Sequence, residues 1–315
     1  MTDFIIKNGV LEKCTGNKTK VVIPDSVIEI GDNAFSGCES LKEITIPDSV
    51  KKIGVGTFWD CVSLEEITIP DSVTEIGGFA FSDCKSLTSI TIPDSVKEIG
   101  RFAFEGCESL KEITIPDSVT EIGDRVFWFC KSLEEITIPD SVKKIGVGTF
   151  CGCVSLENIT IPDSVTEIGE HAFSSCVSLE NITIPDSVTV IGEGAFYGCE
   201  KLADENGFVI VKNVLYNYYG NAEKVIIPDY VTKIGDFAFS HCNSLEEITI
   251  PDFVTEIGGG TFFACKSLEK IIIPDSVTEI SGFAFKDCEK LVIKAPENSY
   301  AHKYAKEKKI KFEAV

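Results

Sequence analysis

Cysteine is the residue of this chain with the most conspicuous chemistry, and its spacing argues against reactivity. Eleven of the thirteen cysteines, from Cys38 to Cys288, recur at one position of a repeating pattern, each three residues after a phenylalanine. Thiols at equivalent positions of a repeat point the same way, whereas a disulfide needs Cβ atoms that converge. No CxxC pair is present. We therefore interpret these eleven as small core residues. We expect Cys14 and Cys151, which lie off the pattern, to be exposed and quick to react.

Histidine and aspartate form no catalytic or metal-binding pattern. His171, His241 and His302 stand at unrelated positions of the repeat, without a partner at ligand spacing or a nucleophile motif nearby. An aspartate follows the proline of every repeat, beginning with Asp25. It either bonds backbone amides of a turn or binds cations, and we favour the turn. The sequence thus predicts no catalytic residue, no cofactor-binding residue and no metal ligand, and a chain that is not an enzyme.

Large aromatic residues occupy positions where the repeats differ, and they are the candidate partner-binding residues. In a helix, the residue after each core phenylalanine and the residue two before it would point outward. These side chains either form an interaction surface or pack sideways on neighbouring repeats. Two further aromatic residues replace a turn serine on adjacent repeats, and they either bind a partner as a pair or are covered by a hairpin carrying Tyr216, Tyr218 and Tyr219. The candidates are Trp59, Phe79, Phe102, Trp128, Tyr197, Phe237 and Phe263, together with the turn residues Tyr230 and Phe253.

A second candidate surface is acidic. Outward-facing strand positions hold carboxylates on many repeats, and these form the candidate acidic strip: Glu43, Glu66, Glu112, Glu135 and Glu247. At a rung spacing of about 4.8 Å, neighbouring carboxylates repel by roughly 1 kcal/mol even in water. The strip is either an ordinary solvated face, which is the simpler interpretation, or a site for a basic or polar partner.

The elements that must position these side chains follow from the repeat itself. Eleven prolines, from Pro24 to Pro274, share one phase, with a step of 23 residues and a single step of 43, which is typical of a solenoid. Within a repeat, an alternating strand (Leu41 to Ile46) is broken at Pro47 and followed by a second short strand (Val50 to Ile53). No repeat can bury its apolar side chains alone, so stacking must build the core. The inward stripe of a short helix completes the unit, at Thr57, Phe58, Cys61 and Leu64.

The 43-residue step divides the repeats into two cassettes. Phe208 to Pro228 aligns without gaps with Phe4 to Pro24, and each segment has the pattern of a β-hairpin that opens a stack. Ser299 to Lys309 has the pattern of a capped helix, and Ile310 to Val315 that of a closing strand. We predict one continuous solenoid with an N-terminal capping hairpin (1–22), a first repeat cassette (23–201), an internal β-hairpin (202–226), a second repeat cassette (227–291) and a C-terminal cap (292–315).

Composition excludes several classes of partner. Lysine and arginine number 29 against 50 aspartates and glutamates, which gives a formal net charge of −21. We therefore expect no binding to nucleic acid or to anionic membrane surfaces. The sequence has no run of 18 apolar residues, so we expect no membrane insertion. No signal peptide is visible, and many free thiols suit a reducing compartment. These features favour the cytoplasm.

The pattern LxxIxIPxxVxxIGxxAFxxCxxL, as in Leu87 to Leu110, resembles the BspA-like (Treponema-type) leucine-rich repeat family. The resemblance covers about nine-tenths of the chain. Ser49 and its equivalents stand where the general leucine-rich-repeat pattern has asparagine, so no asparagine ladder is expected. The resemblance implies a right-handed superhelix, a binding role, a cell-surface or secreted location, and no catalytic residues.

We therefore predict an α/β repeat solenoid, a right-handed leucine-rich-repeat superhelix of 23-residue strand–turn–short strand–helix units. We expect it to act as a non-enzymatic, adhesion-like scaffold for a protein or a glycan. The alternative is a structural or self-associating module without a specific ligand, because near-identical faces can pair with one another.

Overall fold

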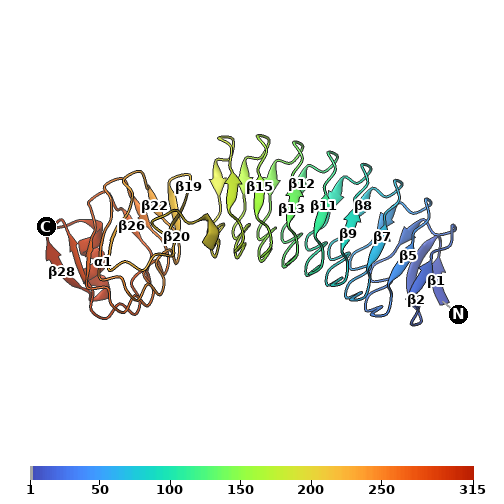
Figure 1. Cartoon of the computed structure of the whole chain (residues 1–315), viewed down its shortest axis with the longest axis horizontal. Coiled ribbons are helices and arrows are strands. Elements are labelled where there is room, and N and C mark those ends of the chain that lie inside the picture. The colour runs from blue at the N-terminus through green and yellow to red at the C-terminus, as the bar shows by residue number, and fades with distance from the viewer. Residues whose placement is uncertain (1–2) are drawn as a thin grey trace. The chain divides into compact units, whose positions relative to one another are not determined.

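The computed structural model describes residues 3–315, and the chain divides into two compact units, Met1–Lys201 (unit 1) and Leu202–Val315 (unit 2). Each unit is a coil whose 23-residue turns, here called rungs, are stacked side by side along the axis of that unit (Figure 1). The repeat solenoid predicted from the sequence is therefore confirmed.

Each rung has three sides. The first carries a three-residue strand, the second a two-residue strand, and the third a series of turns. The three-residue strands of unit 1 are β3 (Lys20–Val22), β5 (Glu43–Thr45), β7 (Glu66–Thr68), β9 (Ser89–Thr91), β11 (Glu112–Thr114), β13 (Glu135–Thr137), β15 (Asn158–Thr160) and β17 (Asn181–Thr183). The two-residue strands of unit 1 are β4 (Glu29–Ile30), β6 (Lys52–Ile53), β8 (Glu75–Ile76), β10 (Glu98–Ile99), β12 (Glu121–Ile122), β14 (Lys144–Ile145), β16 (Glu167–Ile168) and β18 (Val190–Ile191).

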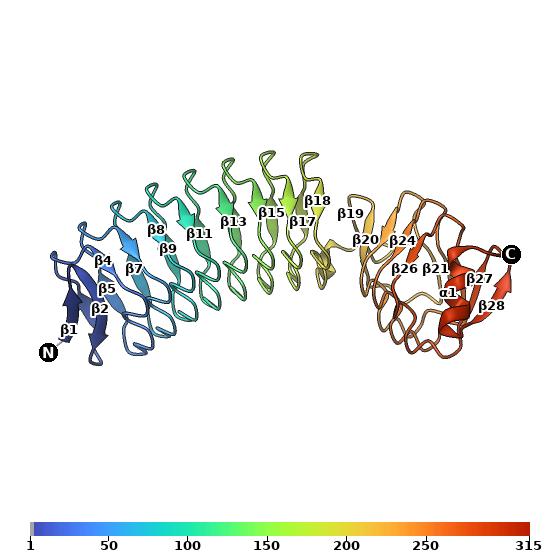
Figure 2. The ribbon, with the colours of Figure 1, turned by 180° about the vertical axis from the view of Figure 1, so that it is seen from behind.

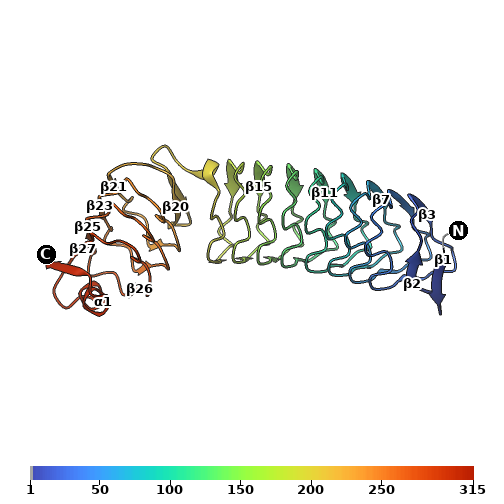
Figure 3. The same ribbon diagram turned by 90° about the horizontal axis from the view of Figure 1, so that it is seen from below.

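Rungs pair in parallel and in register, so each residue faces the one 23 positions later. Ile44 of β5 pairs with Ile67 of β7, and Ile53 of β6 pairs with Ile76 of β8. The three-residue strands form the ladders β3-β5-β7, β9-β11-β13 and β15-β17 along one side of unit 1 (Figure 3). An antiparallel hairpin, β1 (Asp3–Lys7) and β2 (Val10–Thr15), opens the unit and pairs through β2 with β4. The register turns every position of the repeat into a column of equivalent side chains.

The third side is a series of turns and not the short helix that we expected. In nearly every rung two residues four positions apart have left-handed backbone, such as Asn33 (φ 56°) and Gly37 (φ 70°). A left-handed residue interrupts an α-helix. The amide of Ser36 therefore bonds the Asn33 carbonyl three residues back, while the amide of Phe35 bonds the Thr57 carbonyl of the next rung. The helix of the predicted α/β unit is not confirmed.

The core of each unit is a set of apolar columns with phenylalanine at the centre. The phenylalanine rings stack along the axis, with centroids 5.2 Å apart for Phe35 and Phe58 and 5.7 Å apart for Phe104 and Phe127. Stacked aromatic pairs add about 0.5–1.5 kcal/mol to the effect of area burial. The core phenylalanines of unit 1 are Phe35, Phe58, Phe81, Phe104, Phe127, Phe150, Phe173 and Phe196.

The cysteines of the repeating pattern lie beside these rings, and their thiols bond the backbone. Cys61 Sγ donates to the Phe35 carbonyl of the preceding rung at 3.2 Å, and the same contact recurs on each following rung of unit 1 through Cys199. Burial raises the pKa of these thiols, to about 12 for Cys61. The predicted core position of this column is confirmed, and its central thiols stay protonated at neutral pH.

Unit 2 opens on a hairpin and closes on a helix. The hairpin consists of β19 (Phe208–Val211) and β20 (Val214–Tyr218). The strands of the rungs are β21 (Lys224–Ile226), β23 (Glu247–Thr249) and β25 (Lys270–Ile272) on the first side, and β22 (Lys233–Ile234), β24 (Glu256–Ile257) and β26 (Glu279–Ile280) on the second. β27 (Val292–Ala295), α1 (Tyr300–Lys308) and β28 (Lys311–Ala314) follow, and α1 lies at the end of the unit (Figure 2). A short 3-10 helix, η1 (Glu200–Leu202), precedes the hairpin in the chain.

Aromatic residues from both ends extend the phenylalanine column of unit 2. Tyr218 of β20 lies 5.1 Å from Phe239, and Tyr304 of α1 meets Phe285 edge-on at 5.9 Å, both measured between ring centroids. Ser299 caps α1 by accepting a hydrogen bond from the His302 amide at 3.2 Å, which its place before the predicted helix implies. The first and last rungs therefore do not leave their core rings open to water.

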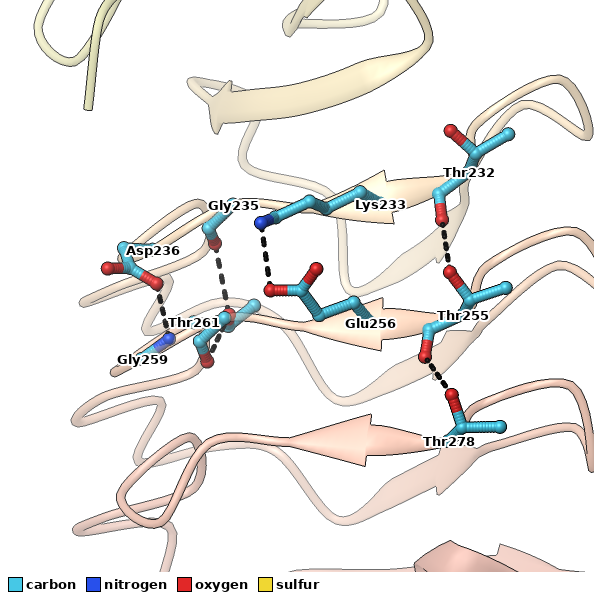
Figure 4. Close-up of polar contacts among 10 residues, drawn as sticks. Thr232, Lys233, Gly235, Asp236, Thr255, Glu256, Gly259, Thr261 and Thr278 are labelled. Carbon is cyan, nitrogen blue, oxygen red and sulfur yellow. Dashed lines mark hydrogen bonds and ion pairs between the residues drawn. The ribbon is translucent and has the colours of Figure 1, made fainter. Parts of the chain in front are cut away.

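Polar columns also bond from rung to rung (Figure 4). In unit 2 the Lys233 ammonium pairs with the Glu256 carboxylate at 2.8 Å. The buried Thr261 hydroxyl lies 3.0 Å from the Gly235 carbonyl and 2.9 Å from the Gly258 carbonyl. Exposed ion pairs contribute about 1 kcal/mol or less. These contacts therefore support the register, while the buried columns provide most of the stability.

Replacing a core phenylalanine is expected to be costly. Phe104→Ala should lower the free energy of unfolding by about 3–5 kcal/mol, because the ring is fully buried between the stacked rings of Phe81 and Phe127. Denaturant unfolding followed by circular dichroism measures the change.

Phe102→Gly is the matched control, two residues away in the same rung. Phe102 is half-buried and has left-handed backbone (φ 60°), as Gly56 and Gly148 do in the same column. Relief of about 1–2 kcal/mol of backbone strain offsets the lost ring contacts. The free energy of unfolding should change by less than about 1 kcal/mol, and equal losses in the two variants would contradict this assignment of columns.

Candidate binding surfaces

Aromatic rings and an arginine form a continuous strip on the turn side of unit 1. Phe79 and Phe102 stack with centroids 4.6 Å apart, Phe102 meets Trp128 at 6.2 Å, and Trp128 stacks on Phe129 at 5.1 Å. The Arg125 guanidinium lies 5.3 Å from the Phe102 centroid and 5.1 Å from that of Trp128, within cation–π range. We call Phe79, Phe102, Arg125, Trp128 and Phe129 the aromatic strip.

The sequence left open whether these aromatic residues form an interaction surface or pack sideways on neighbouring repeats, and the aromatic strip does both in part. Its rings pack sideways on neighbouring rungs, yet Phe79, Phe102 and Trp128 are only half-buried and 43% of Phe129 is exposed. The sequence did not single out Arg125 or Phe129. A helix would turn only Trp128 outward. The backbone of Phe129 is left-handed (φ 58°) and not helical, so its side chain is exposed as well. The sequence feature that could have identified Phe129 was the run of three consecutive aromatic residues at 127–129.

Three of the candidates stand where the backbone favours glycine. Phe79, Phe102 and Phe237 have φ values of 57°, 60° and 56°, in a column that also holds Gly56 and Gly148 with positive φ. Left-handed backbone costs a non-glycine residue roughly 1–2 kcal/mol. Phenylalanine bears this cost on these rungs, whereas glycine avoids it on others of the same column.

The other candidates on the turn side are more isolated. Trp59 is 48% exposed and Tyr197 45% exposed, on rungs to either side of the strip, and Phe237 of unit 2 is 41% exposed. Phe263 is half-buried. The edge of the His241 ring meets it at 5.4 Å between centroids. The structure places all these side chains at the surface, and the ring contacts join only Phe79, Phe102 and Trp128 of the predicted set.

Tyr230 and Phe253 project into solvent on adjacent rungs of unit 2. They are 56% and 66% exposed, whereas Tyr216 and Tyr218 of the hairpin are buried. The alternative in which that hairpin covers the pair is therefore wrong. On most other rungs a serine hydroxyl at this column bonds a valine carbonyl of the preceding rung, as Ser49 bonds Val27 in unit 1. The aromatic substitutes cannot make that bond, and they remain a candidate pair.

The acidic strip contains one concentrated patch. Glu112 of β11 faces Glu135 of β13 in the parallel register. Both line an open hollow of 390 Å³ together with Lys111 and Glu134. All four side chains are exposed, so solvent screens their charges. This patch can attract a basic group, but it offers no enclosed site.

Elsewhere the acidic strip is partly neutralised. Glu43 faces Glu66 but also pairs with Lys20 of the preceding rung. Glu247 of unit 2 lies 3.3 Å from the Lys224 ammonium. A partner that needed a uniform row of carboxylates would not find one here. The acidic strip is therefore the weaker of the two candidate surfaces.

Expectations for two thiols are corrected. Cys14 is only 8% exposed, because β2 lays it against the end of the cysteine column, and it is not the accessible thiol that we expected. Cys151 is half-buried, and burial raises its pKa. The half-exposed thiols also include Cys38, Cys242 and Cys288, which stand at the ends of the two cysteine columns. At those ends a neighbouring rung is missing on one side.

The three histidines do not cluster with one another. His171 and His241 are exposed, and His302 is half-buried. Among residues 3–315 no three histidine, cysteine, aspartate or glutamate side chains gather in a group that could hold a metal ion. No helix in the described part of the chain is long and apolar enough to cross a membrane.

The rungs match a known repeat. The model of the BspA type leucine rich repeat region matches residues 5–134, 120–206 and 209–305. The chain belongs to the BspA-type leucine-rich repeat family. Leucine-rich-repeat proteins are generally non-enzymatic scaffolds, and nothing among the described residues points to catalysis. No curated protein matches the chain.

Solved structures of bacterial leucine-rich repeat proteins are similar to this chain over nearly its full length. A leucine-rich repeat protein from Bacteroides ovatus is 29% identical with a TM-score of 0.67, covering 100% of this chain and 98% of its own. A leucine rich cell surface protein from Faecalibacterium prausnitzii is 29% identical with a TM-score of 0.58, covering 99% and 92%. The pneumococcal vaccine antigen PcpA, 23% identical with a TM-score of 0.51, covers 92% and 78% and shows likeness of fold alone.

Thiol labelling of the native protein should follow this burial. Among the thiols of unit 1, Cys38 should react first, since a hydrogen bond from Cys14 lowers its pKa to about 7, so its labelling rate should rise with pH up to about pH 8 and then level off. Burial raises the pKa of Cys242 to about 11, so its rate should keep rising. Labelling with iodoacetamide at several pH values, followed by peptide mass spectrometry, measures both. Cys14 reacting faster than Cys38 would restore the expectation from the sequence.

Proposed function

We propose that this chain is a non-enzymatic, adhesion-like scaffold that binds a protein partner on the aromatic strip of unit 1. The observation that supports it most is the set of mutually stacked, partly exposed rings of Phe79, Phe102, Trp128 and Phe129, with Arg125 lying over two of them. Tryptophan and arginine are enriched among residues that dominate binding energy at protein interfaces.

The strip suits a protein partner better than a small ligand. It follows three rungs, or roughly 10 Å between the first and last at about 4.8 Å per rung, and Trp59 is exposed separately on the preceding rung. Small ligands prefer concave sites that enclose most of their surface. A row of half-exposed rings on a rigid stack instead resembles the centre of a flat interface. The net charge of −21 favours a basic partner, because opposite charge speeds association.

The relatives support a location outside the cell. The Faecalibacterium prausnitzii protein is a leucine rich cell surface protein and is similar to this chain over 99% of its length. A scaffold at a cell surface meets host or neighbouring-cell proteins, which is consistent with an adhesion-like role. A glycan partner is the second ligand class, and glycan binding to the wild-type chain that survives loss of the strip would place it elsewhere on the surface.

The exposed pair Tyr230 and Phe253 supports a second candidate function, self-association. These side chains are 56% and 66% exposed on adjacent rungs, and exposed apolar patches mark association sites. Sedimentation velocity over a range of protein concentrations tests it. A monomer at every concentration would leave binding of another molecule as the role of this chain.

The strip can be removed with residues that the chain itself uses in the same columns. Phe102→Gly introduces the residue found at Gly56, and Trp128→Ser the residue found at Ser82. Once a partner is captured from host-surface extract, the double variant should bind it at least about 30-fold more weakly, equivalent to about 2 kcal/mol. Surface plasmon resonance measures the affinity, and circular dichroism shows that the fold is retained.

Ile226→Thr is the matched control. Ile226 is 81% exposed on the three-residue-strand side of unit 2, and the next rung has Thr249 at this position. This substitution removes exposed apolar area away from the strip and should leave the affinity unchanged. If the double variant bound with unaltered affinity, the proposal would be wrong, and the acidic strip would be the next surface to test.

A further inference from the structure

The first thiol of the cysteine column in unit 1 has a different neighbour from the thiols inside the column. Cys61 Sγ donates to the carbonyl of Phe35, which lies 26 positions earlier. For Cys38, on the first rung, the residue 26 positions earlier is Glu12, an exposed residue of β2. On its N-terminal side Cys38 therefore meets the hairpin and not another rung, and its thiol accepts a hydrogen bond from that of Cys14.

The hairpin holds the two thiols together. The Cys14 amide donates to the Ala34 carbonyl at 2.7 Å, which fastens β2 against the first rung. Cys14 and Cys38 line one narrow cavity of 10 Å³, walled by Phe35 and Leu41. A cavity of this size is at or below the limit for holding a single water molecule. Both cysteines are free thiols.

The two thiols differ in the way that reactive pairs do. Cys14 is 8% exposed and keeps its proton, because its thiol donates to Cys38 and burial also raises its pKa. That hydrogen bond lowers the pKa of Cys38 to about 7, with a further contribution from the charge of Lys13. Cys38 is thus a half-exposed thiol of lowered pKa with a second thiol beside it.

We propose that Cys14 and Cys38 are a redox modification site, at which a reversible disulfide fastens the N-terminal hairpin to the first rung. The oxidant is a low-molecular-weight disulfide, and the reductant that reverses the step is a low-molecular-weight thiol. This inference is independent of the proposed binding function, because the aromatic strip lies on other rungs.

The exchange balances without a further reactant. The Cys38 thiolate attacks one sulfur of the small disulfide, forming a mixed disulfide and releasing one small thiolate. Cys14 then loses its proton to solvent, and its sulfur attacks the Cys38 sulfur of the mixed disulfide and releases the second small thiolate. The protein loses two electrons and two protons, and the small disulfide becomes two thiols.

A second thiol pair, Cys265 and Cys288, shares the hydrogen bond between thiols, which lowers the pKa of Cys288, but it differs in backbone placement. Cys265 and Cys288 lie 23 residues apart on parallel rungs, so their Cβ atoms point the same way, whereas a disulfide needs converging ones. Their thiols also donate to core carbonyls, at 3.0 Å for Cys265 and 2.9 Å for Cys288. Cys14 comes from a hairpin strand and stands 24 residues before Cys38, outside the rung register. In unit 2 the corresponding hairpin position holds Tyr218, so Cys242 provides an internal control.

The experiment treats the reduced full-length chain with oxidised glutathione, alkylates the remaining thiols under denaturing conditions, and maps them by peptide mass spectrometry. We expect eleven of the thirteen cysteines to be alkylated and Cys14 to be joined to Cys38, with full reversal by dithiothreitol. Oxidation should also slow amide hydrogen exchange in β1 and β2 by about tenfold, because a cross-link removes open states of the hairpin.

Two variants and one control make the result decisive. Cys14→Ser should abolish the cross-link and leave Cys38 as a mixed disulfide with glutathione. Cys14→Tyr, which copies Tyr218 of unit 2, should do the same if the serine variant folds poorly. Cys151→Ser, which removes a half-buried thiol elsewhere in unit 1, should leave the cross-link intact. Mixed disulfide without a cross-link in the wild-type chain, a cross-link from Cys265 to Cys288 in its place, or thirteen alkylated cysteines would each overturn the proposal.

Discussion

The structure depends on one constraint: a rung cannot bury its apolar side chains alone, so each must pair in register with the next, 23 residues later. The stacked rings of Phe81, Phe104 and Phe127 are the direct expression of that register. The polar groups of the core obey it too, because the Cys130 thiol bonds the Phe104 carbonyl of the preceding rung. Any change of the step would break the ring, thiol and backbone contacts together, which explains why the inward columns barely vary along the chain.

A uniform core leaves the outward columns free to vary. The column that holds Gly56 also holds Phe102 and Arg125, and all three have left-handed backbone. The rungs on either side determine that backbone conformation, and the side chain does not. Aromatic residues can therefore accumulate at one place on the turn side without a change of fold, although each carries a cost in backbone strain. The result is a rigid row of side chains, which reduces the entropy lost when a partner binds.

The ends of each unit are where this regular chemistry changes. Inside the stack, every ladder thiol has a carbonyl partner and stays protonated. At the first rung the missing neighbour is replaced by a hairpin, and Cys38 meets Cys14. At the last rung of unit 2, Tyr304 of α1 covers the core ring of Phe285. A cap that must differ from a rung in order to close the stack can also bring together side chains that no rung does.

The sequence by itself determined the repeat, its register and the identity of the buried columns. The spacing of Phe104 and its equivalents is periodic, and periodicity is a property of the chain that needs no coordinates. The capping role of Ser299 could also be predicted from the sequence, because the cap bonds a residue only three positions away. Only the tertiary structure decided the backbone conformation of the third side. There, hydrogen bonds to the next rung replace the hydrogen bonds of a helix that would be too short to be stable on its own. That backbone brought Arg125 and Phe129 into the aromatic strip, and the packing of the hairpin buried Cys14. These outcomes depend on contacts between residues 20 or more positions apart, which neither residue type nor local phase encodes.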